Sequence, residues 1–127
     1  MAVSVIVVIG AGIAGSGAAF RLASRGAKPR VIERVFPASG PTGKSSAITH
    51  AFYMLPALSR LAIRGCDLLA RIPELTGHAS CVSPVGMMWV MSEAAMPAWA
   101  ATVARIQGEG ARIETLTPED FAKAAPA

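Results

Sequence analysis

Three glycines close to the N-terminus have the spacing of a dinucleotide-binding turn. Gly10, Gly12 and Gly15 form the pattern G-x-G-x-x-G, and the acidic residue Glu33 follows about twenty residues later. The first glycine permits a tight turn, the second lets a pyrophosphate approach the backbone, and the third lets a helix pack on a strand, while the acid bonds ribose hydroxyls. The candidate cofactor-binding residues of the turn are Gly10, Ala11, Gly12, Ile13, Ala14 and Gly15.

The helix that follows such a turn has its own part in the chemistry. Its first N–H groups lack partners inside the helix, and its positive dipole end favours phosphate. The acid at position 33 argues against NADP, although Arg34 follows it directly. The turn does not distinguish NAD from FAD, and a tight strand-to-helix turn without any ligand is the alternative interpretation.

The flanking sequence contains the elements needed to position these residues. Residues 3–9 are almost all apolar and rich in β-branched side chains, which is typical of a strand buried in a parallel sheet. Apolar residues at helical spacing over 13–24 predict a helix that ends at Gly26, and residues 30–33 predict a second strand. The fold class is therefore α/β, beginning with the βαβ unit of a partial Rossmann-type domain.

The apolar start of the chain has two other interpretations, a membrane span and a signal peptide. Residues 2–20 carry no charge and are long enough to cross a bilayer. However, no Lys or Arg precedes them, four glycines interrupt them, and their first half favours a strand. We therefore expect no membrane span.

Charge and cysteine usage exclude further classes of function. The net charge is +4, but the arginines are scattered and not interleaved with aromatic residues, so we expect no nucleic-acid partner. Cys66 and Cys81 do not form a CxxC pair, which favours a reducing compartment, the cytoplasm. His78 and Cys81 lack enough neighbouring ligands to predict a metal site.

The rest of the sequence predicts a loop and then alternating helices and strands. Residues 36–49 form a loop rich in Pro, Gly and Ser, and a loop of this length is usually functional. The elements expected after it are a helix over 54–72 ended by Pro73, a strand over 82–91, a helix over 94–109 with Pro97 in its first turn, a short strand over 112–115, and a helix that begins at Thr117.

The loop after Glu33 carries a resemblance to a known family. It reads R34-V-F-P-A-S-G40-P-T-G43-K-S-S-A-I-T-H50-A-F-Y53. With the glycine turn and Glu33-Arg34, it resembles the N-terminal portion of the FAD-dependent amine oxidoreductases of the D-amino-acid oxidase superfamily. The likeness is to the branch of sarcosine oxidase, sarcosine dehydrogenase and dimethylglycine dehydrogenase. It extends through V85-G-M-M-W-V-M91 and L116-T-P-E-D-F121.

This resemblance implies a cofactor, a reaction and a set of site residues. The cofactor is FAD, with its pyrophosphate on Gly10 to Gly15, its ribose on Glu33 and its adenine near Arg34. The residues beside the flavin ring are Gly43, Lys44, Ser45, Ser46, Ala47 and Ile48, although turn chemistry alone also explains the serines. The implied reaction moves a hydride from a C–H next to nitrogen, in a small-molecule amine or amino-acid substrate, to the flavin, and water hydrolyses the resulting imine.

One position departs from the pattern of the relatives. Many relatives carry an arginine where this sequence has His50, and that arginine can clamp a substrate carboxylate with two parallel hydrogen bonds. Histidine cannot form such a fork. His50 is therefore our only catalytic candidate, as a substrate-facing residue, with a structural role as the alternative.

The resemblance also implies that the fold needs more polypeptide than this chain supplies. We expect residues 1–80 to form the N-terminal part of an FAD-binding domain and residues 81–127 to begin an α+β substrate domain. A central strand such as 3–9 needs neighbours on both sides, so a partner chain or a further C-terminal region should complete the sheet and allow activity. The alternatives are a non-catalytic nucleotide-binding subunit and part of a small NAD-dependent dehydrogenase.

Overall fold

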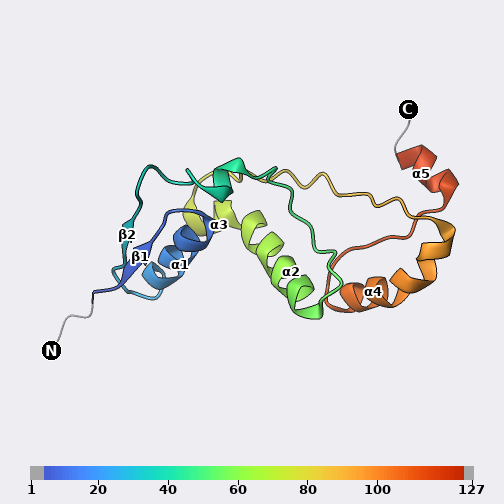
Figure 1. Cartoon of the computed structure of the whole chain (residues 1–127), viewed down its shortest axis with the longest axis horizontal. Coiled ribbons are helices and arrows are strands. Elements are labelled where there is room, and N and C mark those ends of the chain that lie inside the picture. The colour runs from blue at the N-terminus through green and yellow to red at the C-terminus, as the bar shows by residue number, and fades with distance from the viewer. Residues whose placement is uncertain (1–4, 125–127) are drawn as a thin grey trace. The chain divides into compact units, whose positions relative to one another are not determined.

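The computed structural model describes residues 5–124 of the chain (Figure 1). The chain divides into two compact units, one up to Ile48 and one from Thr49 onward, and each is described by itself. This division does not test the domain boundary predicted at residue 80, which stays a prediction.

The first unit is a βαβ arrangement, as the sequence predicts. Strand β1 (Val7–Ile9) pairs in parallel with β2 (Arg30–Ile32), and Val8 lies opposite Val31. Helix α1 (Ile13–Ala23) connects the two strands. Gly26 follows the helix with a φ of +84° and donates its N–H to the carbonyl of Ala23, so the predicted helix end is confirmed. Both strands are shorter than predicted, and residues 3 and 4 of the expected first strand lie outside the described residues.

The glycine-rich loop after β2 contains one short helix that the sequence does not reveal. This 3₁₀ helix, η1 (Pro41–Lys44), begins with a proline, whose fixed φ suits the first turn of a helix. The rest of the loop has no regular structure up to Ile48.

The regular elements described in the second unit are all helices. Helix α2 (Pro56–Ala70) is followed by the short α3 (Ile72–Thr76), and η2 (Glu93–Ala95) leads into α4 (Met96–Gly108). The last helix is α5 (Pro118–Ala124), which begins after Thr117 as predicted: the Thr117 hydroxyl accepts the N–H of Asp120. Pro97 lies in the first turn of α4, where it was expected.

Three predictions for this unit are wrong. Pro73 does not end the long helix; the helix stops at Ala70, and Pro73 occupies the first turn of α3, where its missing N–H costs nothing. Residues 82–91 and 112–115 form no strands, because no neighbouring strand pairs with them within the described residues. The described residues beyond 80 therefore contain helices but not the β-structure of the expected α+β domain.

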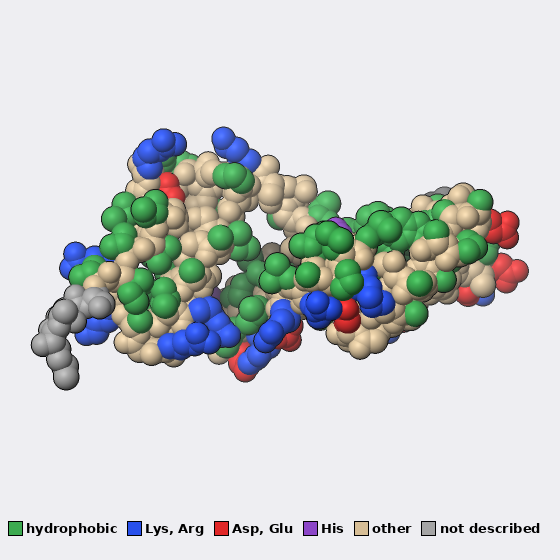
Figure 2. All heavy atoms as spheres, turned by 60° about the horizontal axis from the view of Figure 1, so that its bottom comes forward, with side chains coloured by type: hydrophobic (Ala, Val, Ile, Leu, Met, Phe, Trp, Pro, Cys, Tyr) green, Lys and Arg blue, Asp and Glu red, His purple; other side chains and the backbone are tan. Residues whose placement is uncertain are grey.

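Few side chains are fully buried. Within the described residues, Ile106 is the only fully buried hydrophobic residue, and Ser59 is the only fully buried polar one. Many large apolar side chains are exposed, and hydrophobic groups occupy much of the face drawn in Figure 2. The three most exposed of these side chains are Val85 at 89%, Ile9 at 87% and Val90 at 82%. Large exposed apolar surfaces usually mark places where another part of the protein or another chain packs.

Candidate dinucleotide-binding site

The backbone around the glycine turn explains why glycines stand there. Gly10 has a φ of +94°, in the left-handed region that side chains disfavour. A Cβ added at Gly15 would collide with the carbonyl oxygen of Gly10, and one at Gly12 would lie 3.0 Å from the Thr42 hydroxyl oxygen. The first turn of α1 therefore lies directly against the end of β1.

The N-terminus of α1 presents free backbone donors. Gly12 is its N-cap and supplies no side-chain acceptor. The N–H of Ile13 donates to Oγ1 of Thr42 at 3.1 Å. Among the described residues, the N–H groups of Ala14 and Gly15 have no acceptor. Such donors, together with the helix dipole, form an anion site of the kind that phosphates occupy.

Glu33 is held against the glycine turn. Its Oε2 accepts the N–H of Ala11 at 2.9 Å, and its Oε1 accepts the N–H of Val35 at 3.1 Å. The bond from Ala11 is the main reason that the pKa of Glu33 lies below its ordinary value of 4.5, and the bond from Val35 adds to it. The side chain is therefore ionised at neutral pH, and each oxygen keeps a lone pair that can accept a ribose hydroxyl. The side chain of Arg34, next to it, is exposed.

The loop after β2 is fastened to the same turn. Ala38 donates its N–H to the carbonyl of Ala11 at 3.0 Å and has a φ of +63°. Its own carbonyl accepts the N–H of Gly43 at 2.9 Å, and a Cβ at Gly43 would collide with that carbonyl oxygen. These bonds bring Thr42 to the start of α1. Sequence reasoning missed Thr42, because nothing in the composition of the loop separates it from the other hydroxyl residues there.

The remaining loop candidates lie just beyond Gly43. Lys44 ends η1, and Ser46 and Ile48 are exposed. Ser45 accepts the N–H of Ala47 at 3.1 Å, and Ala47 has a φ of +55°. This local bond is the turn chemistry that the sequence left open as an alternative. The Ser45 hydroxyl donates to no acceptor among residues 5–124, so its proton is free to bond a ligand.

His50 belongs to the second unit, where aromatic rings surround it. Its imidazole stacks on Tyr53 with the ring centroids 4.6 Å apart, and it meets Trp89 edge-on at 5.8 Å. Its Nδ1 atom is buried and has no hydrogen-bond partner among the described residues. Packing rather than hydrogen bonding therefore holds the ring.

A comparison with protein families identifies the family of the chain. The family described as FAD dependent oxidoreductase (DAO) matches residues 6–127. The chain belongs to this family. Comparisons with curated proteins and with solved structures found no match.

The cofactor of this family is FAD, and the residues around the turn fit it. The free N–H groups of Ala14 and Gly15 suit a pyrophosphate, and the ionised Glu33 suits a ribose. A side chain at Gly12 would fill the space next to Thr42 that a close-lying phosphate needs. The glycines and the acid are thus compatible with the cofactor of this family.

Two other features are absent from the described residues. Across residues 5–124, no group of three or more His, Cys, Asp or Glu side chains is arranged to hold a metal ion. In that range, none of the helices combines the length and apolar character needed to cross a membrane.

Proposed function

We propose that this chain is the FAD-binding N-terminal part, or subunit, of an oxidoreductase that oxidises an amine or amino acid. The observation that carries the proposal is the contact between Glu33 and the N–H of Ala11 at 2.9 Å. It joins the acid at the end of β2 to the glycine turn at the end of β1. In a dinucleotide-binding unit, this is the place where the acid meets the ribose hydroxyls.

Each part of the cradle has a task in this proposal. When bound, FAD supplies the acceptor for a hydride from a substrate C–H next to nitrogen. The N–H groups of Ala14 and Gly15 hold the pyrophosphate, and the Glu33 carboxylate accepts the ribose hydroxyls. The loop residues Gly43 to Ile48 lie beside the flavin ring, where free N–H groups and the Ser45 or Ser46 hydroxyl donate to its polar atoms. Arg34 lies near the adenine.

His50 is the residue that we propose to face the substrate. It stands where relatives of the sarcosine oxidase branch carry an arginine, and an imidazole offers one donor instead of a fork. We therefore propose that the substrate is an amine, or an amino acid whose carboxylate is not held by the usual two parallel bonds. The aromatic rings of Tyr53 and Trp89 give this position an apolar, electron-rich surrounding that suits an alkylamine.

Further polypeptide is part of the same proposal. Among the described residues, β1 has β2 as its only neighbour, and the side chain of Ile9 is 87% exposed. We propose that another chain, or a further C-terminal region, covers this strand and completes the enzyme. Cys66 and Cys81 are free thiols, which supports a reducing compartment, the cytoplasm.

The proposal is tested by titrating the purified full chain with FAD and following flavin fluorescence. We expect saturable binding that weakens about tenfold or more in Glu33→Gln, because the amide keeps the shape but loses the charge-assisted hydrogen bonds. Glu119→Gln is the matched control, since Glu119 is an exposed acid in α5. NAD is titrated in parallel.

Three results decide between the candidate functions. No FAD binding by the chain, alone or with the polypeptide that completes it, would sink the proposal. Preferential binding of NAD would favour the dehydrogenase alternative. Flavin that binds in the completed assembly but is not reduced by any amine or amino acid would favour the non-catalytic subunit.

A further inference from the structure

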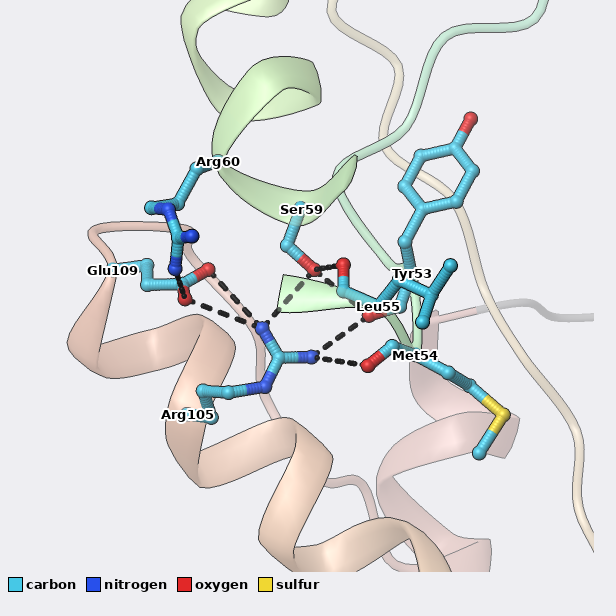
Figure 3. Close-up of polar contacts among 7 residues, drawn as sticks. All are labelled: Tyr53, Met54, Leu55, Ser59, Arg60, Arg105 and Glu109. Carbon is cyan, nitrogen blue, oxygen red and sulfur yellow. Dashed lines mark hydrogen bonds and ion pairs between the residues drawn. The ribbon is translucent and has the colours of Figure 1, made fainter. Parts of the chain in front are cut away.

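Arg105 makes a long-range contact that the proposed function does not use. In the second unit, its guanidinium reaches from α4 to the segment that enters α2 (Figure 3). Its Nη2 donates to the carbonyls of Tyr53 at 2.9 Å and of Met54 at 3.1 Å. Its Nη1 donates to the hydroxyl of Ser59 at 3.2 Å. One side chain therefore holds three acceptors that lie about fifty positions away in the sequence.

Further polar contacts hold both the carbonyl of Tyr53 and the guanidinium of Arg105 in place. Ser59 is fully buried, and its hydroxyl donates to the Tyr53 carbonyl at 2.8 Å. Glu109, the C-cap residue of α4, accepts from Nη1 of Arg105 at 3.2 Å and from Arg60 at 3.4 Å, and its side chain is 16% exposed. The planar fork of an arginine can serve several acceptors in fixed directions, which a lysine ammonium cannot do. The Tyr53 carbonyl is thus held by two donors.

The fixed carbonyl belongs to the residue that stacks on His50. The rings of Tyr53 and His50 lie 4.6 Å apart at an angle of 19°. Because Nδ1 of His50 has no partner among the described residues, the imidazole takes its orientation from the rings around it. A shift of the Tyr53 backbone would therefore move the His50 ring.

We propose that Arg105 is a positioning residue, which sets the orientation of His50 by clamping the backbone of Tyr53 and Met54. This inference rests on the proposed function in one respect only: the orientation matters for turnover if His50 faces the substrate. The clamp itself requires neither flavin nor substrate.

The chain offers a direct probe of this clamp. Tyr53 is its only tyrosine, so 3-fluorotyrosine labelling of the full chain gives a single ¹⁹F signal. Replacing His50 by leucine removes the stacked ring and should shift that signal. The change in ¹⁹F chemical shift caused by His50→Leu is measured in the otherwise native chain. It is also measured in three variant chains, Arg105→Met, Arg105→Lys and Arg60→Met. Arg60→Met is the matched control, because it removes the other arginine on Glu109 but leaves the clamp in place.

We expect the shift caused by His50→Leu to persist in Arg60→Met and to be lost in Arg105→Met and Arg105→Lys, with unchanged helical circular dichroism. An undiminished shift in Arg105→Lys would overturn the proposal, and so would an equal loss in Arg60→Met. If Arg105→Met fails to fold, Arg105→Lys decides, because it keeps the charge and most of the stem. A failure of FAD binding in the titration described above would refute the proposed function. It would leave the ¹⁹F test of Arg105 unchanged.

Discussion

Two glycines of α1 provide a matched test of how tightly the cradle is built. A Cβ at Gly15 would collide with the carbonyl oxygen of Gly10, whereas a Cβ at Gly17 would meet nothing within 4 Å. Both residues lie in the same helix. Gly15→Ala and Gly17→Ala therefore make the same chemical change and gain the same helix propensity, and they differ only in the clash with the turn.

The gain in helix propensity can be weighed against the cost of the clash. Replacing a helical glycine by alanine stabilises the helix by about 1 kcal/mol. Overpacking costs about 1–3 kcal/mol, and we take about 3 kcal/mol for Gly15 because the obstacle is backbone and cannot rotate away. Gly15→Ala should then be destabilised by about 2 kcal/mol, while Gly17→Ala should gain about 1 kcal/mol. At about 4 °C per kcal/mol, the two melting temperatures should differ by about 12 °C.

Thermal unfolding followed by circular dichroism measures this difference, and an FAD titration of the same samples shows whether the cradle survives. We expect Gly17→Ala to bind FAD like the native chain and Gly15→Ala to bind it weakly or not at all. Melting temperatures within 2–3 °C of each other, on a scale of about 4 °C per kcal/mol, would refute the argument that α1 lies directly against Gly10.

Two further predictions concern the contacts around the turn. Thr42→Val keeps the shape of the side chain but removes the acceptor of the Ile13 N–H, so it should lower the free energy of unfolding by about 1 kcal/mol in chemical denaturation. Thr49→Val, an exposed position, should cost almost nothing, and equal losses at both positions would contradict the role of Thr42. The lowered pKa of Glu33 predicts a pH dependence: its stabilising effect is present above its ordinary pKa of 4.5 and is lost as the pH falls through the folded-state pKa. The melting temperature of Glu33→Gln should therefore lie below that of the native chain at pH 7 and approach it in acid, whereas a constant gap would rule out an ionised Glu33.

The first unit was largely predictable because its signals are local. Strand composition, helical spacing and Gly26 lie within the segments that they specify, and the βαβ unit formed as expected. The contact between Glu33 and the glycine turn follows from parallel pairing, since the ends of adjacent parallel strands meet at one edge of the sheet. The contact of Thr42 with α1 depends instead on how a loop folds back, and no sequence period encodes that.

The second unit was less predictable because its decisive contacts are distant in sequence. A helix was expected over 54–72, but the clamp that Arg105 forms on the segment before α2 lies beyond any local pattern. Arginine side chains mostly lie exposed on protein surfaces, yet the side chain of Arg105 is only 26% exposed. Composition does not distinguish it from Arg60, which is 61% exposed.

Residues 82–91 show why an apolar pattern alone does not make a strand. Their composition favours extended structure, but a strand exists only where a neighbour completes its hydrogen bonds. Among the described residues no such neighbour pairs with them, and Val85 and Val90 are 89% and 82% exposed. An unpaired apolar segment of this kind is prone to pair with another chain. It therefore gives a second reason, independent of β1, to propose that further polypeptide packs on this chain.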